Sequence, residues 1–196
     1  MGDNLDDAAL DLIFRAARTH RYWIDRPVPD DVLRAAYDLA KMAPTSANCS
    51  PMRVVFVKSP AAKARLKPAL IPGNVRQTMA APVTAVIGHD LRFYDLLPRL
   101  YPPADARAWF AGNDALIRST AMRNGSLQGA YFILAARALG LDCGPMSGFD
   151  NAKVDAEFFP DGRVGSNFLC NLGYGDETRL GPRSPRLDFA EACAVV

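Results

Sequence analysis

The stretch DALIRSTAMRNGSLQGAYFILAARALG, residues 114–140, carries the longest helical pattern of the sequence. Gly140 directly follows its last apolar residue, which is the usual place of a glycine that ends a helix. From Ala130 to Leu139 the pattern is apolar on nearly every side, as in helices that are buried all round. We therefore expect one long helix over residues 114–139, buried at the centre of the fold.

Weaker helical patterns precede and follow this helix. Apolar residues at helical spacing predict helices over residues 5–17, with Asn4 as N-cap, and from Asp30 onward. Further segments are a weak helix at 60–70, a loop or helix entry at 71–81, a short helix near 151–159, and an extended tail with a short helix at 182–196.

Three runs of β-branched and apolar residues predict buried strands: RVVFVK (53–58), PVTAVIGH (82–89) and NFLCNLGYG (167–175). Residues 91–113 are irregular and rich in proline, arginine and aromatic residues. They would form either a mobile flap over a pocket or a layer packed on the outside. Helices and strands that interleave around one sheet indicate an α/β or α+β fold.

Length and composition favour one globular domain over residues 1–196. The net charge of +2, with no Lys/Arg run longer than a pair, argues against a nucleic-acid partner. The longest uncharged apolar run, GAYFILAA, is too short to cross a membrane. Four separated cysteines without a CxxC motif, and an acidic start unlike a targeting signal, predict a cytoplasmic protein. Two scattered histidines predict no metal site.

Dinucleotide-binding motifs are weak in this sequence. GYGDET, residues 173–178, follows a predicted strand but lacks the third glycine of the GxGxxG pattern. A turn at the end of the strand is the better interpretation. Redox chemistry would therefore need a bound cofactor that accepts hydride in the same pocket that the substrate uses.

Two arginine clusters and one polar loop have the chemistry of a phosphate-bearing ligand site. RTHR (18–21) follows the first predicted helix, and GPRSPR (181–186) lies in the tail. Guanidinium groups bind phosphate in a bidentate manner, although solvated surface arginine is the simpler interpretation of either cluster alone. The loop APTSANCSPMR (43–53) is longer and more polar than most helix-to-strand connections.

Taken in order, these segments resemble the FMN-dependent nitroreductase family over essentially the whole chain. The matching segments are RTHR, the loop at 43–53, the residues just before APV, and ARALGLDCGPMSGFD, followed by the basic tail. The resemblance implies an α+β fold, with a three-layer sandwich around a mostly antiparallel sheet. It also implies a homodimer with FMN at the subunit interface, the C-terminal tail extending to the partner, and NADH or NADPH as electron donor.

The resemblance also implies which residues contact FMN. Arg18, Thr19, His20, Arg21, Arg183 and Arg186 would surround its phosphate, although His20 would equally serve as a polar group at a helix end. Pro44, Thr45, Ser46 and Asn48 would face the ribityl chain and ring edge. Asn74 and Gln77 would face the pyrimidine edge, where relatives often place a lysine instead of Gln77. Pro145, Met146, Ser147 and Gly148 would offer backbone groups near the reactive edge of the ring.

Within the family, the segments APTSANCSPMR, LPRLYPPADARAWF and GPMSGFD are most similar to malonic semialdehyde reductases of pyrimidine degradation. This implies reduction of malonic semialdehyde to 3-hydroxypropionate by ping-pong hydride transfer, with no side-chain nucleophile. Arg53, Arg99 and Arg107 are candidates for binding the substrate carboxylate. A broad-scope nitroreductase or quinone reductase, and a flavin-binding protein without turnover, are the alternatives.

Overall fold

The computed structural model describes residues 4–196 and places a four-stranded sheet at the centre of the fold. Its strands are β1 (Met52–Val57), β2 (Val83–Asp90), β3 (Asp142–Met146) and β4 (Val164–Gly173). They lie in the order β1-β2-β4-β3, and each neighbouring pair is antiparallel. The fold is therefore α+β, as the resemblance implied.

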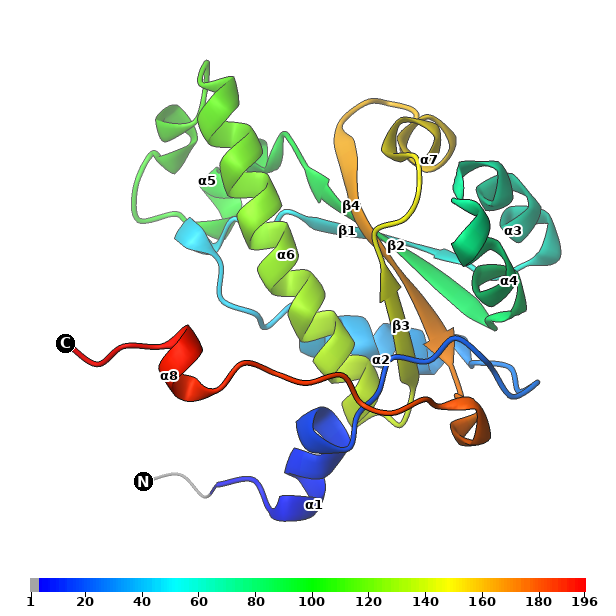
Figure 1. Cartoon of the computed structure of the whole chain (residues 1–196). Coiled ribbons are helices and arrows are strands. Elements are labelled where there is room, and N and C mark those ends of the chain that lie inside the picture. Colours follow the sequence, from blue (N-terminus) through cyan, green and yellow to red (C-terminus); the bar gives the residue numbers. More distant parts are fainter. Residues whose placement is uncertain (1–3) are drawn as a thin grey trace.

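Helices cover both faces of this sheet. In Figure 1, α6 lies on one side of the sheet and α3, α4 and α7 lie on the other. The described α-helices are α1 (Asp7–Leu10), α2 (Asp30–Ala40), α3 (Pro60–Leu66), α4 (Pro72–Ala80), α5 (Leu97–Leu100), α6 (Asp114–Ala138), α7 (Asn151–Phe158) and α8 (Phe189–Ala192).

The core consists of two apolar layers, one on each face of the sheet. One layer packs Leu33 and Ala36 of α2 and Phe132 of α6 against the strands. The other packs Leu66 of α3 and Val154 of α7 against the opposite face. Helix, sheet and helix therefore form the predicted three layers. Every residue of β2 is buried, because this strand lies between two others and is covered on both faces.

Helix α6 is the predicted long helix, and Gly140 follows it with a positive φ of 78°, the conformation that glycine adopts readily. The expectation that it is buried all round is wrong for the single chain. Phe132 is fully buried, but Met122, Leu127 and Tyr131 are 46%, 45% and 41% exposed. The apolar sequence of α6 therefore includes a face that residues 4–196 leave partly exposed.

Three other predictions need correction. The first helix is capped by Asp6, not Asn4, because the Asp6 side chain accepts a hydrogen bond from the Ala9 amide. Residues 72–80, expected to be a loop or helix entry, form α4, with Pro72 at a position where the missing N–H costs nothing. Strand β3 was not predicted, because its Gly144 and Pro145 disfavour strands; it is tolerated at the edge of the sheet.

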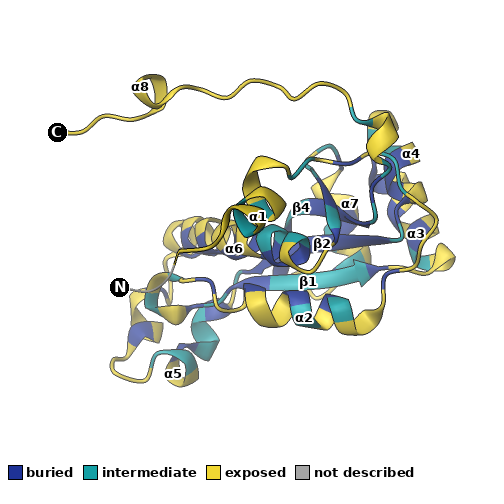
Figure 2. Ribbon diagram, turned by 90° about the horizontal axis from the view of Figure 1, so that it is seen from below, coloured by how far each residue is buried: buried dark blue, intermediate teal, exposed yellow. Residues whose placement is uncertain are grey.

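Two peripheral segments extend away from the sheet. Residues 91–113 form short helical turns, including α5, around a small core of their own that contains Phe93, Leu97 and Phe110. The tail from residue 181 onward is exposed along its whole length and extends away from the body of the chain (Figure 2). Within residues 4–196, no helix is both long and apolar enough to cross a membrane.

Candidate functional site

The segment that follows the first helix lies against β3. Thr19 forms a parallel β-bridge with Cys143, and the His20 amide donates to the Cys143 carbonyl at 3.0 Å. His20 is only 4% exposed, and its Nε2 lies 3.4 Å from Oδ1 of Asp142. Backbone pairing therefore fixes the RTHR segment beside the edge strand of the sheet.

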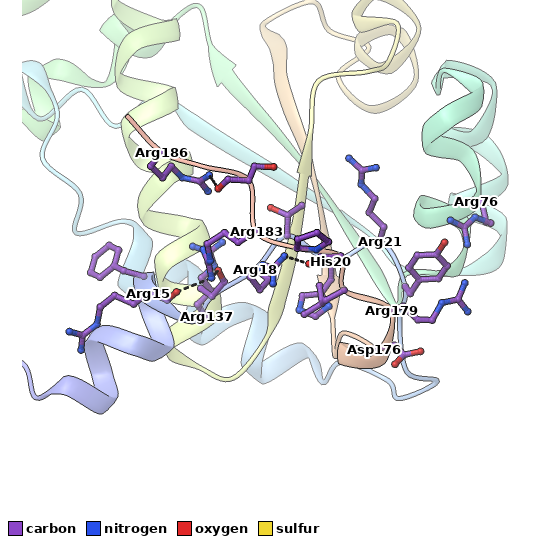
Figure 3. Close-up of a pocket in the computed structure, with 18 residues that line it drawn as sticks. Arg15, Arg18, His20, Arg21, Arg76, Arg137, Asp176, Arg179, Arg183 and Arg186 are labelled. Carbon is purple, nitrogen blue, oxygen red and sulfur yellow. Dashed lines mark hydrogen bonds between the residues drawn. The ribbon is translucent and has the colours of Figure 1, made fainter. Parts of the chain in front are cut away.

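This segment forms one wall of a cavity of about 780 Å³, which we call the arginine cavity. Eight arginines line it and Asp176 is the one acidic residue in the lining, so its electrostatic potential is strongly positive (Figure 3). The arginines are Arg15, Arg18, Arg21, Arg76, Arg137, Arg179, Arg183 and Arg186.

The start of the C-terminal tail forms another wall of this cavity. Arg18 donates to the Gly181 carbonyl at 2.7 Å, and Arg183 donates to the carbonyls of Arg15 and Ala17 at 2.8 and 3.0 Å. Arg186 bonds only carbonyls of the tail itself, at 2.9 and 3.1 Å. Two predicted basic clusters that are far apart in sequence therefore lie side by side.

A second cavity of about 270 Å³, the amide pocket, lies between α4 and the end of β3. Asn74 donates to the Gly148 carbonyl at 2.9 Å, and Gln77 donates to Oδ1 of Asn74 at 2.7 Å. Gly148 must be small, because a Cβ there would lie 2.5 Å from Ile71 and 2.6 Å from the Asn74 amide. The residues that line the amide pocket are Thr19, His20, Arg21, Ile71, Asn74, Gln77, Gly144, Pro145, Met146, Ser147 and Gly148.

The two cavities share Thr19, His20 and Arg21, so they form one continuous groove. One end offers guanidinium groups, and the other offers side-chain amides and the polar backbone of residues 144–148. This donor set fits a ligand with a phosphate at one end and a flat heterocycle at the other. Twelve of the sixteen residues predicted to contact FMN line this groove.

The four remaining residues, Pro44, Thr45, Ser46 and Asn48, line neither cavity. The Ser46 amide donates to Asn124 of α6 at 2.9 Å, and the Asn48 side chain donates to the Leu100 carbonyl at 2.9 Å. Ala47, Asn48 and Ser50 have positive φ values of 49°, 49° and 41°, which are uncommon outside glycine. The loop is tightly shaped, but this chain does not bring it to its own groove.

The three candidate carboxylate-binding arginines differ in their partners. Arg53 donates to the fully buried Asp90 at 2.5 Å, and Arg107 pairs with Asp95 at 3.4 Å. Arg99 is exposed and forms no ion pair with any residue in the described part of the chain. The structure therefore leaves only Arg99 of the three free of an acidic partner.

Several lining residues were missed from the sequence. Arg15 and Arg137 occupy helices, and Tyr22, Arg76 and Arg179 lie far apart in the chain. Arg76 stands between Asn74 and Gln77 in sequence. This position beside two predicted site residues was the one indication that it lines the site. Nothing in GDETR, residues 175–179, singled out Arg179.

Comparisons with known proteins identify the family of this chain. A family model described as "Nitroreductase family" matches residues 14–174. A Burkholderia lata protein named "Putative NADH dehydrogenase/NAD(P)H nitroreductase" is 65% identical over 97% of this chain and 98% of its own length. A Polynucleobacter asymbioticus protein of the same name is 60% identical over the full length of both chains. A nitroreductase-type structure from Exiguobacterium sibiricum, solved in complex with FMN, superposes with a TM-score of 0.85 at 19% identity, covering all of both chains. The chain belongs to the nitroreductase family.

Proposed function

We propose that this protein is a single-domain, homodimeric FMN-dependent oxidoreductase that takes electrons from NADH or NADPH. The observation that carries the proposal is the continuous groove, which joins an arginine-rich end to an amide-lined end at Thr19, His20 and Arg21. Bound FMN would supply hydride acceptance and donation. The family and the names of the relatives at 60–65% identity support this chemistry.

The residues of the groove have separate tasks in this proposal. Arg18, Arg183 and Arg186 neutralise the phosphate of the cofactor, with hydrogen-bonding support from Thr19 and His20. Asn74 and Gln77 orient the pyrimidine edge through their amides. The Pro145–Gly148 segment allows close approach of the ring, because Gly148 carries no side chain. Gln77 carries no charge, so it would stabilise negative charge on a bound flavin ring only through the dipole of its amide.

The loop at residues 43–50 reaches a site only in a dimer. Helix α6 holds this loop at Asn124. Further along α6, Ala130 and Ile133 line a third cavity, which shares Pro145, Met146 and Ser147 with the amide pocket. Two-fold packing of the exposed α6 faces would place the partner's copy of the loop over this chain's pocket. The uncovered Leu127 and Tyr131 support such packing.

For the substrate, we propose malonic semialdehyde. The proposal rests on the similarity of three segments to malonic semialdehyde reductases and on Arg99, which has no acidic partner among the described residues. Arg99 precedes Leu100, whose carbonyl accepts from Asn48 of the polar loop, so it would enter the dimer site with that loop. A nitroaromatic is the second candidate, because the relatives carry the name NAD(P)H nitroreductase.

The test compares kcat/KM for malonic semialdehyde with that for a nitroaromatic, using FMN-loaded protein. The Arg99→Met variant should lose at least tenfold in kcat/KM for the semialdehyde and keep its rate with the nitroaromatic, because a charge-assisted bond contributes about 1.5–3 kcal/mol. Arg34→Met, at an exposed position on α2, is the matched control. A wild-type preference for the nitroaromatic would reject the semialdehyde. Protein that takes up no FMN would reject the whole proposal.

A further inference from the structure

The arginines of the arginine cavity form two groups with different surroundings. Arg18 donates to a backbone carbonyl of the tail, and Arg183 donates to a carbonyl of the first helix. Arg137 of α6 lines the same part of the cavity. Arg76 and Arg179 lie together at the opposite end of the cavity, with Arg21 between the two groups (Figure 3). The phosphate of FMN occupies one group in the function proposed above, and the second group has no role in it.

The second group is organised around Tyr22. The guanidinium carbon of Arg76 lies 4.2 Å from the centroid of the Tyr22 ring, and that of Arg179 lies 4.1 Å from it. Cation–π contacts at these distances hold both planar groups against the ring. We call Tyr22, Arg76 and Arg179 the tyrosine–arginine cluster.

Backbone contacts fix this cluster in place. The Asp176 amide donates to the Tyr22 carbonyl at 3.0 Å, which anchors the short turn that carries Arg179. On the other side, the Trp23 indole donates to the Gln77 carbonyl at 3.1 Å, which anchors α4 and therefore Arg76. The cluster is thus held from two elements, and Gln77 connects it directly to the amide pocket.

The charge of the cluster is not neutralised by the protein. Neither Arg76 nor Arg179 forms an ion pair with a carboxylate anywhere in residues 4–196. Asp176 accepts from the Thr178 amide and hydroxyl at 3.1 and 2.6 Å, and so caps its own turn. The guanidinium groups of Arg76 and, to a smaller extent, Arg179 lower the pKa of Tyr22. Two guanidinium groups at one ring repel each other, and a dianion between them would relieve that repulsion.

We propose that the tyrosine–arginine cluster is a second phosphate-binding site, which takes the 2′-phosphate of NADPH. A phosphate monoester dianion accepts bidentate bonds from two guanidinium groups and one bond from the phenol. NADPH carries such a monoester and NADH does not. The site therefore selects NADPH as the electron donor. This inference rests on the proposed function, because it places the donor at the groove that holds FMN.

The chemistry alone would also suit the phosphate monoester of FMN, so the experiment distinguishes the two sources. FMN-loaded wild type, Arg76→Gln/Arg179→Gln and Arg34→Gln are compared for FMN affinity, for binding of adenosine 2′-monophosphate, and for the rate of flavin reduction by NADPH and NADH. Arg34 is exposed on α2, so Arg34→Gln is a control for the loss of surface charge away from the cluster. An Arg76→Lys/Arg179→Lys variant separates charge from bidentate geometry.

The double glutamine variant should bind adenosine 2′-monophosphate at least tenfold more weakly and lose a similar factor in kcat/KM for NADPH. Its FMN affinity and its kcat/KM for NADH should stay within about twofold of wild type, because NADH has no monoester to lose. The lysine variant should recover part of the NADPH preference. Loss of FMN affinity would assign the cluster to the cofactor phosphate and overturn the inference. Equal losses with both donors, or no binding of adenosine 2′-monophosphate to wild type, would overturn it as well. Calorimetric binding of adenosine 2′-monophosphate needs no turnover, so it still reports if the proposed activity fails.

Discussion

Lys63 on α3 is a buried lysine without an acidic partner, and it makes the stability of this protein depend on pH. The residue is 4% exposed, and its Nζ donates to the Thr78 carbonyl at 2.8 Å and to the Thr84 hydroxyl at 2.6 Å. Burial lowers the pKa of Lys63 from 10.5 to about 7. In the described chain, no carboxylate forms an ion pair with it.

The sign of the effect follows from proton binding in the two states. Between pH 7 and pH 10.5 the unfolded chain binds the lysine proton and the folded chain does not. The free energy of unfolding therefore rises with pH in this window, by up to about 1.4 kcal/mol per pH unit. Below pH 7 both states are protonated, and the folded state carries the full cost of the buried charge, on the order of 4–5 kcal/mol.

Replacement of Lys63 by Met exchanges this pH-dependent cost for a fixed one. The variant leaves the Thr78 carbonyl without its donor, which costs about 1–3 kcal/mol. The Thr84 hydroxyl keeps its bond to Asn171, at 2.7 Å. We therefore expect Lys63→Met to be more stable than wild type at pH 6 and less stable at pH 10. The stability difference should change sign between these values.

Urea unfolding at a series of pH values between 6 and 10 measures this difference, at one fixed protein concentration. Burial raises the pKa of the Cys49 thiol to about 11, which lowers stability in alkali, but this effect is common to both proteins and cancels. Lys67→Met, at an exposed position, is the control and should give a difference that does not vary with pH. A constant difference between wild type and Lys63→Met would show that Lys63 is not neutral in the folded protein, and would refute the reasoning.

Two further changes test the core and the dimer. Asp90 is fully buried between two arginines, so Asp90→Ala should lower the free energy of unfolding, measured by urea titration, by about 3–5 kcal/mol. The control Asp38→Ala removes an exposed ion pair and should lower it by less than about 1 kcal/mol. Mixing inactive Arg18→Ala chains with inactive Asn48→Ala chains should restore about a quarter of the sites if the partner supplies the polar loop, since random exchange gives half mixed dimers with one intact site each. Mixed chains that stay inactive after subunit exchange would place the loop and the groove in the same subunit's site.

The sequence predicted those elements whose signal is local. The strands β1, β2 and β4 are built mainly of apolar and β-branched residues, so the residues themselves indicate buried strands. Strand β3 gives no such signal, because its Gly144 and Pro145 are tolerated only through its position at the sheet edge. Propensity therefore failed where tertiary position decides the structure.

The residues of the candidate site likewise divide into those that the sequence could predict and those that it could not. From composition alone the RTHR and GPRSPR segments were weak candidates for phosphate binding, and the resemblance to the family implied that role; the structure places them at one cavity. Tyr22, Arg76 and Arg179 could not be predicted as a group, because a stack of three side chains from separate segments leaves no pattern along the chain. Arg53 suited a substrate carboxylate by type alone, but it pairs with Asp90, which lies on the neighbouring strand.

The apolar character of α6 has two physical causes that a sequence cannot separate. Phe132 and Ala136 are buried against this chain's own sheet, whereas Leu127 and Tyr131 are apolar although they remain 45% and 41% exposed in the described part of the chain. The hydrophobic effect acts on exposed apolar area in the same way, whichever chain removes it from water. A helix that packs against its own core on one face and against another chain on the other face therefore has the sequence pattern of a helix buried all round. The polar loop beside Asn124 has the same ambiguity: its residues have the chemistry of the groove, but they line neither of its two cavities. Both observations agree with the proposal that the complete site requires two chains.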